Sequence, residues 1–169
     1  MYTNQSGKSI SLGNEIAKGG EGTIFDVDKY TCAKIYLQNT KKKYKQDKLS
    51  YMISNPPPEI EGDNYKICWP KDIIYKKGEF AGFLMSKSFD NSLLPYHLCQ
   101  LKMPPNLEKK WHNIYDRESQ SGIISRLKLC VNIIAAVNRV HKGNKYIIVD
   151  LKPQNLLVTA SGKVSIIDM

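Results

Sequence analysis

Three polar side chains near the end of the chain have the types and spacing that suit phosphate chemistry. Asp150 follows the β-branched run Ile147–Val149, and Asp168 follows a second β-branched run; Asn155 lies between the two acids. Apolar runs that stop on an acid predict strands whose ends present carboxylates. Residues 158–163 include a glycine able to take positive φ and predict a hairpin turn. We therefore expect the two acids and the amide to meet at one locus.

The side-chain oxygens of this group favour a magnesium site. Carboxylate and amide oxygens are hard ligands, suited to Mg²⁺ and hence to a phosphate substrate. Lys152, close behind Asp150, adds a cation for a phosphoryl group in transfer. An ordinary strand-loop-strand with a proline turn would explain the same letters without chemistry. The motifs that precede this stretch in order favour the chemical interpretation.

A glycine run and a lysine near the start of the chain add to this pattern. Residues 14–27 hold three glycines between β-type flanks, which predicts a hairpin whose backbone N–H groups can approach a ligand. Lys34 lies inside an apolar strand predicted over Tyr30–Tyr36, where a lysine is costly unless an anion meets it. A plain hairpin turn and a lysine that reaches solvent from an edge strand are the alternatives.

Taken together, these motifs resemble the protein kinase family. The stretch Asp150–Asn155 reads Asp-Leu-Lys-Pro-Gln-Asn and matches the family's catalytic loop; Asp168 takes the place of its second metal-binding acid. Ile148 and Val149 replace the family's His and Arg, and Met169 replaces its Phe. Because Ile148 and Val149 are apolar, we expect the loop before Asp150 to be held by apolar packing.

The resemblance extends over nearly the whole chain from about Leu12 and is closest to a bacterial branch of Ser/Thr kinase-like proteins. It implies an α+β, protein-kinase-like fold with an antiparallel-sheet small lobe at 13–85. A loose segment at 1–12 would precede it, and a hinge and an incomplete, partly helical large lobe would follow at 86–169. Since the sequence ends just past Asp168, we expect a fragment of a longer protein.

The resemblance also implies a role for each site residue, with ATP and Mg²⁺ as cofactors. Asp150 would accept or orient the substrate hydroxyl, and Lys152 would offset charge on the γ-phosphoryl group. Asn155 and Asp168 would hold Mg²⁺. Lys34 would hold the α- and β-phosphates and pair with a helix acid. The other expected nucleotide contacts come from the glycine loop, that helix and the hinge: Ala17, Gly19, Gly20, Gly22, Ile24, Asp47, Met85, Ser86 and Ser88.

Two helices and a second hairpin are predicted between these motifs. A helix over 39–54 must end at the prolines that follow it. Strands over 69–75 and 79–85 flank a turn at 76–78, and 102–121 has the character of an insertion or mobile connection. The strongest predicted helix is 122–141. It carries an apolar stripe that we expect to be core, and part of this stripe would be exposed in a fragment. That stripe consists of Ile123, Leu127, Val131, Ile134 and either Val137 or Asn138.

Composition sets outer limits on the function. The chain has 169 residues, 41% of them hydrophobic, and a net charge of +9, which suits an anionic ligand such as a nucleotide. Its four cysteines form no CxxC pair, so zinc is disfavoured and reduced thiols in the cytoplasm are expected. No run has the length of a membrane span, and the N-terminus lacks the apolar run of a signal peptide. Because no aromatic platform accompanies the lysines at 41–45, nucleic-acid binding is disfavoured.

Three functions remain open. The first is transfer of the ATP γ-phosphoryl group to a Ser or Thr hydroxyl of an unidentified protein substrate. The second is a nucleotide-binding pseudokinase or regulatory fragment without catalysis. The third is a small-molecule kinase, which Lys152 disfavours because such enzymes usually lack a lysine at that place. The three histidines show no nucleophile-base pattern, so each is expected to be structural or exposed.

Overall fold

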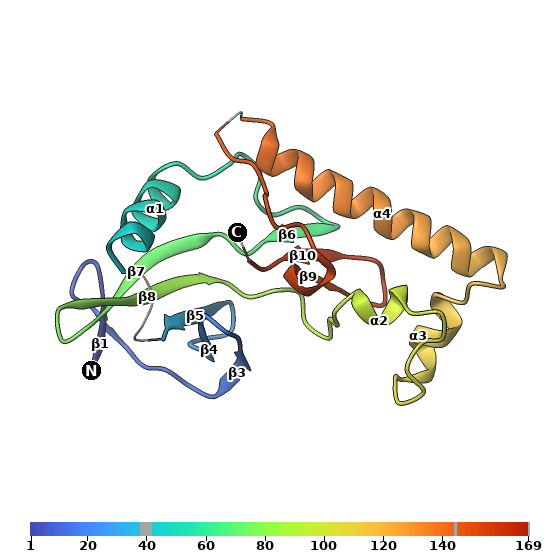
Figure 1. Ribbon diagram of the computed structural model, residues 1–169, viewed down its shortest axis with the longest axis horizontal. Helices are drawn as coiled ribbons and strands as arrows, with labels where there is room; N and C mark the ends of the chain where they lie inside the picture. Colours follow the sequence, from blue (N-terminus) through green and yellow to red (C-terminus); the bar gives the residue numbers. More distant parts are fainter. Residues whose placement is uncertain (38–41, 144, 169) are drawn as a thin grey trace. The chain divides into compact units, whose positions relative to one another are not determined.

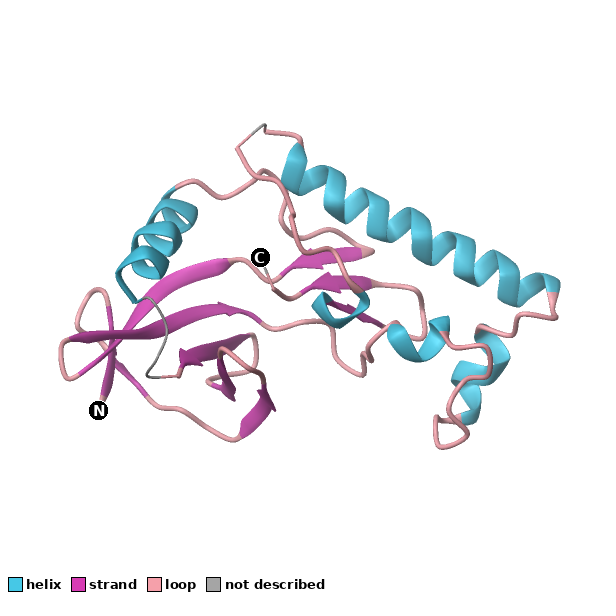
Figure 2. Cartoon of the chain, viewed as in Figure 1, coloured by secondary structure: helices cyan, strands magenta, loops and turns pink. Residues whose placement is uncertain are grey.

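The computed structural model describes residues 1–37, 42–143 and 145–168 (Figures 1 and 2). The chain divides into two compact units. Unit 1 comprises Met1–Pro56 and Trp69–Lys87, and unit 2 comprises Pro57–Cys68 and Ser88–Met169. Met169 and the predicted first residues of the helix over 39–54 lie outside the described residues.

Unit 1 is built on one sheet of seven strands, in which every neighbouring pair is antiparallel. Helix α1 (Lys42–Ser54) packs on the strands β7 and β8. Antiparallel strands and one helix are what the sequence predicts for this half of the chain. In sheet order, the strands are β2 (Ser9–Ile10), β1 (Tyr2–Asn4), β7 (Pro70–Lys76), β8 (Glu79–Ser86), β5 (Thr31–Tyr36), β4 (Gly22–Asp26) and β3 (Glu15–Lys18).

Turn residues and a buried tryptophan determine the geometry of unit 1. Lys77 and Gly78 have φ of 53° and 82°, so β7 and β8 are joined by the tight turn predicted at 76–78. Trp69 is 1% exposed and donates its indole N–H to the carbonyl of Met52 at 3.0 Å. The carbonyl of Met52 thus accepts a side-chain hydrogen bond near the end of α1, where the backbone carbonyls lack donors within the helix. The buried Leu49 completes the contact of α1 with the sheet.

The N-terminal segment differs from the expectation of a loose stretch at 1–12. Strand β1 pairs with β7 through Tyr2 and Lys76, Thr3 and Tyr75, and Asn4 and Ile74. The side-chain amide of Asn4 also donates to Asp72 at 2.8 Å. Strand pairing of this kind needs few apolar residues, because the backbone supplies most of the hydrogen bonds. The polar composition of 1–12 therefore did not reveal it.

Unit 2 holds a three-stranded sheet, in which β10 (Val164–Ile166) lies between β6 (Tyr65–Ile67) and β9 (Leu156–Val158). The pairing of β9 with β10 is the predicted hairpin, and Gly162 in its turn has φ of 84°. The pairing of β6 with β10 is parallel. The predicted strand at Ile147–Val149 is wrong, since these residues form neither strand nor helix.

Among its described residues, unit 2 has three α-helices and one short 3-10 helix: α2 (Tyr96–Cys99), α3 (Lys109–Ile114), α4 (Gln120–His141) and η1 (Pro153–Asn155). The expected mobile connection at 102–121 includes α3 and two core aromatic residues. Trp111 and Tyr115 are 3% and 0% exposed, and their rings stack at 5.9 Å between centroids. The Tyr115 hydroxyl donates to the carbonyl of Thr159 at 3.2 Å, which ties this segment to the β9–β10 hairpin.

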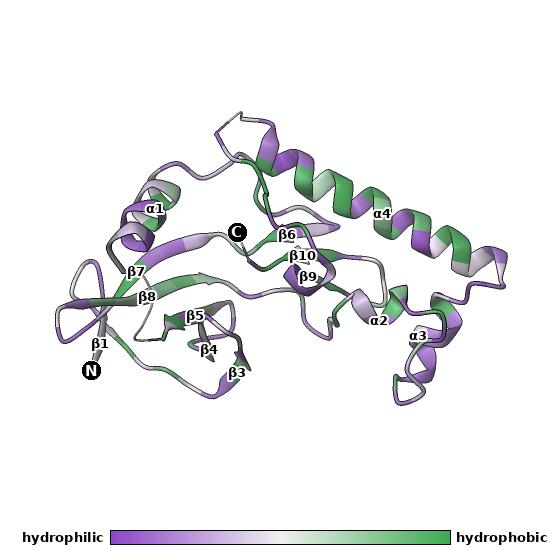
Figure 3. Ribbon diagram, viewed as in Figure 1, coloured by the Kyte–Doolittle hydropathy of each residue, from purple (hydrophilic) through white to green (hydrophobic). Residues whose placement is uncertain are grey.

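Helix α4 begins at the N-cap Ser119, whose hydroxyl accepts from the backbone N–H of Gly122 at 3.1 Å. Its buried face consists of Leu129, Ala136 and Val140. The apolar stripe predicted to be core lies on the other face of the helix. The prediction that it is buried is wrong, since Leu127, Val131 and Ile134 are 61%, 63% and 67% exposed. The apolar stripe of α4 is thus exposed, as was expected for part of it. Apolar residues recur along α4 in Figure 3. Among the described residues, no helix is both long and apolar enough to cross a membrane.

Candidate functional site

One face of the unit 1 sheet gathers four of the residues predicted to contact nucleotide. Ala17 is opposite Ile24 across β3 and β4, and Ile24 is opposite Lys34 across β4 and β5. Directly opposed residues of antiparallel strands project their side chains to the same face. Met85 shares it, because it lies two residues from Phe83, the partner of Lys34 on β8. The sheet thus brings Ala17, Ile24, Lys34 and Met85 together.

Lys34 is a charged residue of this face, and it is unusually buried. It lies on β5 next to the buried Ala33 and is 9% exposed. Its Nζ lies 5.9 Å from the centroid of the Tyr36 ring. Removing an ammonium group from water is costly unless anions or dipoles compensate. A lysine so placed is therefore expected to have an anion or a dipole close to its ammonium group.

The turn between β3 and β4 is closed by a hydrogen bond from the Gly19 N–H to the Gly22 carbonyl at 2.9 Å. Gly22 is required by packing, since a Cβ there would lie 2.4 Å from the carbonyl oxygen of Ile35. Packing does not require the other two glycines. A Cβ on Gly19 would have its nearest neighbour at 3.8 Å, and one on Gly20 would meet nothing within 4 Å. The open backbone at 19–20 leaves room for a ligand to approach.

The acid expected to pair with Lys34 was Asp47, and the structure places that side chain in solvent on α1. A different acid lies near the lysines. Glu21, in the glycine turn, forms an ion pair with Lys45 of α1 at 2.8 Å. The hydrogen bond from Lys45 lowers the pKa of Glu21, and the charges of Lys45, Lys34 and Lys48 lower it further against a smaller opposing effect of burial. Sequence reasoning missed Glu21.

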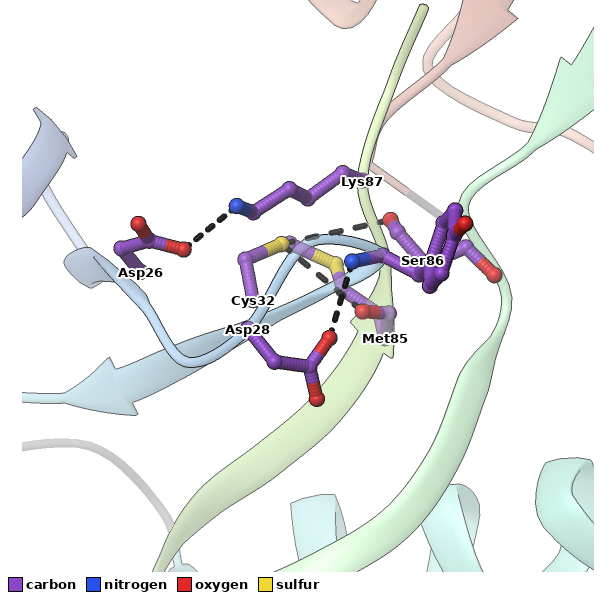
Figure 4. A network of polar contacts seen from close by, with 7 residues as sticks. Asp26, Asp28, Cys32, Met85, Ser86 and Lys87 are labelled. Carbon is purple, nitrogen blue, oxygen red and sulfur yellow. Dashed lines mark hydrogen bonds and ion pairs between the residues drawn. The ribbon is translucent and has the colours of Figure 1, made fainter. Parts of the chain in front are cut away.

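The segment after β8, expected to be the hinge, is anchored to the β4–β5 connection (Figure 4). The Lys87 N–H donates to the Tyr30 carbonyl at 2.9 Å, and its Nζ pairs with Asp26, which raises the pKa of Lys87. Asp28 accepts from the Tyr30 N–H at 2.8 Å and so shapes the turn. These bonds fix the direction in which the chain leaves β8.

The predicted hinge residues themselves differ in their surroundings. The hydroxyl of Ser86 is buried and has no hydrogen-bond partner among the described residues. Ser88 is half-buried in unit 2. The thiol of Cys32 points to the carbonyls of Met85 and Ser86, at 3.8 and 3.9 Å, and burial raises its pKa to about 11 (Figure 4). A thiol with such a pKa stays protonated and is a poor nucleophile.

In unit 2 the predicted catalytic residues are joined by direct bonds. The Lys152 Nζ lies 2.5 Å from a carboxylate oxygen of Asp150. The Asn155 amide nitrogen donates to the same oxygen at 3.2 Å and to the Asp150 carbonyl at 2.9 Å. The hydrogen bond from Lys152 lowers the pKa of Asp150, and Asn155 adds to that effect. Asp150 is thus ionised at neutral pH and can accept a hydrogen bond from a hydroxyl.

Asp168 comes to the same loop through the backbone. The N–H of the preceding residue, Ile167, donates to the Asn155 carbonyl at 3.0 Å. As predicted, the β9–β10 hairpin returns the chain beside the loop that carries Asp150 and Asn155. Asn155 is 8% exposed, so its position is fixed by packing as well as by its hydrogen bonds.

The donor set of this loop fits Mg²⁺ bound together with a phosphate ligand. Asn155 uses its amide nitrogen toward Asp150, which leaves its oxygen for a cation, and Asp168 offers a carboxylate. No group of three or more His, Cys, Asp or Glu side chains able to hold a metal occurs within the described ranges. Mg²⁺ is commonly held by one or two carboxylates, with water and substrate phosphate as its other ligands. The set therefore suits a nucleotide-bound ion.

The loop before Asp150 is not held as expected. Apolar packing was predicted, but Ile147 and Val149 are 79% and 93% exposed. Instead, the N–H of Ile148 donates to Nε2 of His141 at 3.0 Å. His141 is the last residue of α4, so the helix end holds the loop through a polar contact. The expectation that the histidines are structural or exposed agrees with this contact at His141.

Comparison with known proteins shows similarity over nearly the whole chain. A protein named protein kinase YegI from Escherichia coli O157:H7 is 27% identical over 173 residues, which cover 99% of this chain and 24% of that protein. The protein of the same name from Escherichia coli strain K12 is 27% identical over 168 residues, or 96% of this chain and 23% of that protein.

The similarity covers nearly all of this chain but only a part of each relative. The chain spans about a quarter of the length of these curated relatives, 24% and 23%. No protein-family model matches the sequence. The mixed α and β content and the antiparallel sheet of unit 1 are compatible with a kinase-like small lobe. The chain is therefore similar, distantly but from end to end, to bacterial proteins named protein kinase.

Proposed function

We propose that this chain is the ATP-binding part of a protein-kinase-like phosphotransferase. The group transferred would be the γ-phosphoryl of ATP, and the acceptor a Ser or Thr hydroxyl of a protein substrate. In this proposal, 13–85 form the small lobe, and 86–169 form the hinge and part of the large lobe. The four cysteines are scattered and form no CxxC pair, which supports a reducing, cytoplasmic location in this proposal.

The observation that carries the proposal is the bonded loop of unit 2. Asn155 donates to Asp150, and the residue before Asp168 donates to Asn155. Asp150 and Asn155 lie on one loop, and the backbone just before Asp168 is bonded to it, which supports an arrangement of two acids and an amide of the kind used in phosphoryl transfer. The name of the relatives and the shared face of Ala17, Ile24 and Lys34 add support.

Each part of the mechanism has a residue to perform it. Ionised Asp150 orients the acceptor hydroxyl and takes its hydrogen bond, while Lys152, 2.5 Å away, places a cation beside it. Asn155 and Asp168 would hold Mg²⁺ through their side-chain oxygens, and the bound ion would offset the negative charge of the phosphates. Lys34 and the backbone at 19–22 hold the phosphates. Because such catalysis consists mainly of positioning and electrostatics, loss of any one part should be severe.

The test is calorimetric titration of the intact chain with ATP, with and without Mg²⁺. Lys34→Ala should weaken binding at least about tenfold, or about 1.4 kcal/mol, in both conditions. Asp168→Asn should weaken it mainly when Mg²⁺ is present. The matched control Lys71→Gln removes one exposed charge from β7 and should change little. Unchanged affinity in both site variants would refute the proposal, and binding without phosphoryl transfer would favour the regulatory alternative.

A further inference from the structure

A second lysine, Lys45, lies over the same tyrosine ring as Lys34. Lys45 projects from α1, and its side chain is 21% exposed, low for a lysine on a surface helix. Its Nζ lies 4.6 Å from the centroid of the Tyr36 ring, and that of Lys34 lies 5.9 Å from the same centroid. Two ammonium groups thus gather around one ring.

Tyr36 is a rigid base for this pair. Its ring lies 5.8 Å from that of Phe80 and 6.0 Å from that of Phe83, centroid to centroid, and both phenylalanines are buried. The face of a tyrosine ring attracts cations weakly, so it holds both lysines in place without neutralising them. Two like charges held close together favour the binding of an anion between or beside them.

An anion of the protein itself already lies at this place. The carboxylate of Glu21 bonds Lys45 at 2.8 Å, and Lys34 and Lys48 are near enough for their charges to lower the pKa of Glu21. Glu21 belongs to the open glycine turn, and its side chain is 62% exposed. Because the carboxylate of this ion pair is mostly exposed, water screens the pair and it contributes little. A ligand with more negative charge can therefore displace it.

We propose that Lys34 and Lys45 form a two-cation site for a polyphosphate, and that Glu21 occupies this site as a built-in competitor when no ligand is bound. The polyphosphate would displace the Glu21 carboxylate and take over its contact with Lys45. In this arrangement α1 contributes a cation to phosphate binding. The inference rests on the proposed function for the identity of the nucleotide, but the anion site stands on the geometry of unit 1 alone.

The test measures affinity for two ligands, inorganic tripolyphosphate and Mg²⁺-ATP, by calorimetry of the intact chain at fixed low salt. Glu21→Gln removes the competing charge and should tighten both affinities by about threefold or more. Lys45→Gln should weaken both by a similar factor, and Lys45→Arg should restore most of the loss. Lys71→Gln, which removes the same charge from an exposed position on β7, should leave both nearly unchanged.

A double substitution separates displacement from a general effect of charge. If Glu21 competes through Lys45, the gain from Glu21→Gln should shrink in the Lys45→Gln background. Independent, additive effects would overturn the proposal, as would unaltered affinity in Glu21→Gln or equal effects of Lys45→Gln and Lys71→Gln. As a direct readout, the carboxyl resonance of Glu21 should show its pKa rising when tripolyphosphate is added, since the bond to Lys45 is lost.

The outcomes distinguish this inference from the proposed function. Binding of Mg²⁺-ATP that depends on Lys34 and Asp168 but is indifferent to Glu21 and Lys45 would overturn the inference alone. Binding of tripolyphosphate with the pattern described, and no specific binding of Mg²⁺-ATP, would keep the anion site and refute the nucleotide function. Failure of both ligands to bind would overturn both.

Discussion

His141 connects the end of α4 to the loop that carries Asp150. The Ile148 N–H donates to Nε2 of its imidazole at 3.0 Å. The residue before it, Val140, is 0% exposed, and the helix end is therefore well anchored. With Ile147 and Val149 exposed, this polar contact carries much of the order that apolar packing does not supply.

We expect His141→Phe to loosen the loop without unfolding the chain. The Ile148 N–H would lose its acceptor, and amide exchange at Ile148 should become about fivefold faster, since a hydrogen bond of this kind contributes about 1 kcal/mol. His141→Gln offers an oxygen acceptor of similar reach and should restore most of the protection. Exchange measured residue by residue tests this, with the amides of β4 and β5 as an internal reference. Equal exchange at Ile148 in both variants would show that the imidazole does not hold the loop.

Several single residues show what sequence can and cannot predict. The hairpin that leads from the Asn155 loop back toward Asp168 was predicted correctly, because its turn lies within one short stretch, whereas the roles of Asp150, Asn155 and Asp168 stay predictions. Glu21 was missed, because its partner Lys45 comes from a helix that only folding brings beside the glycine turn. No local pattern of letters indicates such a contact.

At the scale of secondary structure, helix α4 has two apolar faces, and only one of them is buried. Leu129 is 7% exposed, while Leu127, two residues earlier, is 61% exposed. The two side chains point to nearly opposite sides of the helix, because two residues turn it by about 200°. The sequence alone favoured the face of Leu127, whose apolar stripe is the more regular.

A matched pair of substitutions tests which face is covered. Leu129→Gln should lower the free energy of unfolding by about 2–5 kcal/mol, since it removes buried apolar area and buries an amide. Leu127→Gln should change it by no more than about 0.5 kcal/mol, because that side chain is already in water. Denaturant titrations of both variants give the comparison, and similar losses would mean that the stripe is covered in solution.

The strands predicted correctly are those bounded by turn signals, such as β7 and β8 around Lys77 and Gly78. The run Ile147–Val149 has strong β propensity but no partner strand, and propensity alone does not form a strand. Strand β6 was missed for the opposite reason. It has three residues, and its partner β10 lies far along the chain, so nothing in the neighbouring sequence marks it.

At the scale of the whole chain, sequence order and spatial units do not coincide. Residues 57–68 stand between α1 and β7 in the sequence, yet they belong to unit 2. Ile67 of β6 is 0% exposed and pairs with Ile166 of β10, and the next residue, Cys68, donates its N–H to the Ile166 carbonyl at 2.8 Å. Glu59 also pairs with Arg139 of α4 at 2.5 Å. Unit 2 thus depends on a segment that a simple cut of the chain at the hinge would remove.

Two isoleucines permit a test of this organisation in the intact chain. Ile67 in unit 2 and Ile73 in unit 1 are both 0% exposed, so Ile67→Ala and Ile73→Ala should each cost about 2–5 kcal/mol of local or global stability. If the units open separately, Ile67→Ala should reduce the exchange protection of amides in β9 and β10 and spare those in β4 and β5, with the reverse for Ile73→Ala. The choice of isoleucine at both positions keeps the change in side-chain volume equal. Native-state hydrogen exchange at low denaturant gives both readouts from one sample. Equal loss of protection in both sheets after either substitution would mean that the chain unfolds as a single cooperative body, despite its division into two units.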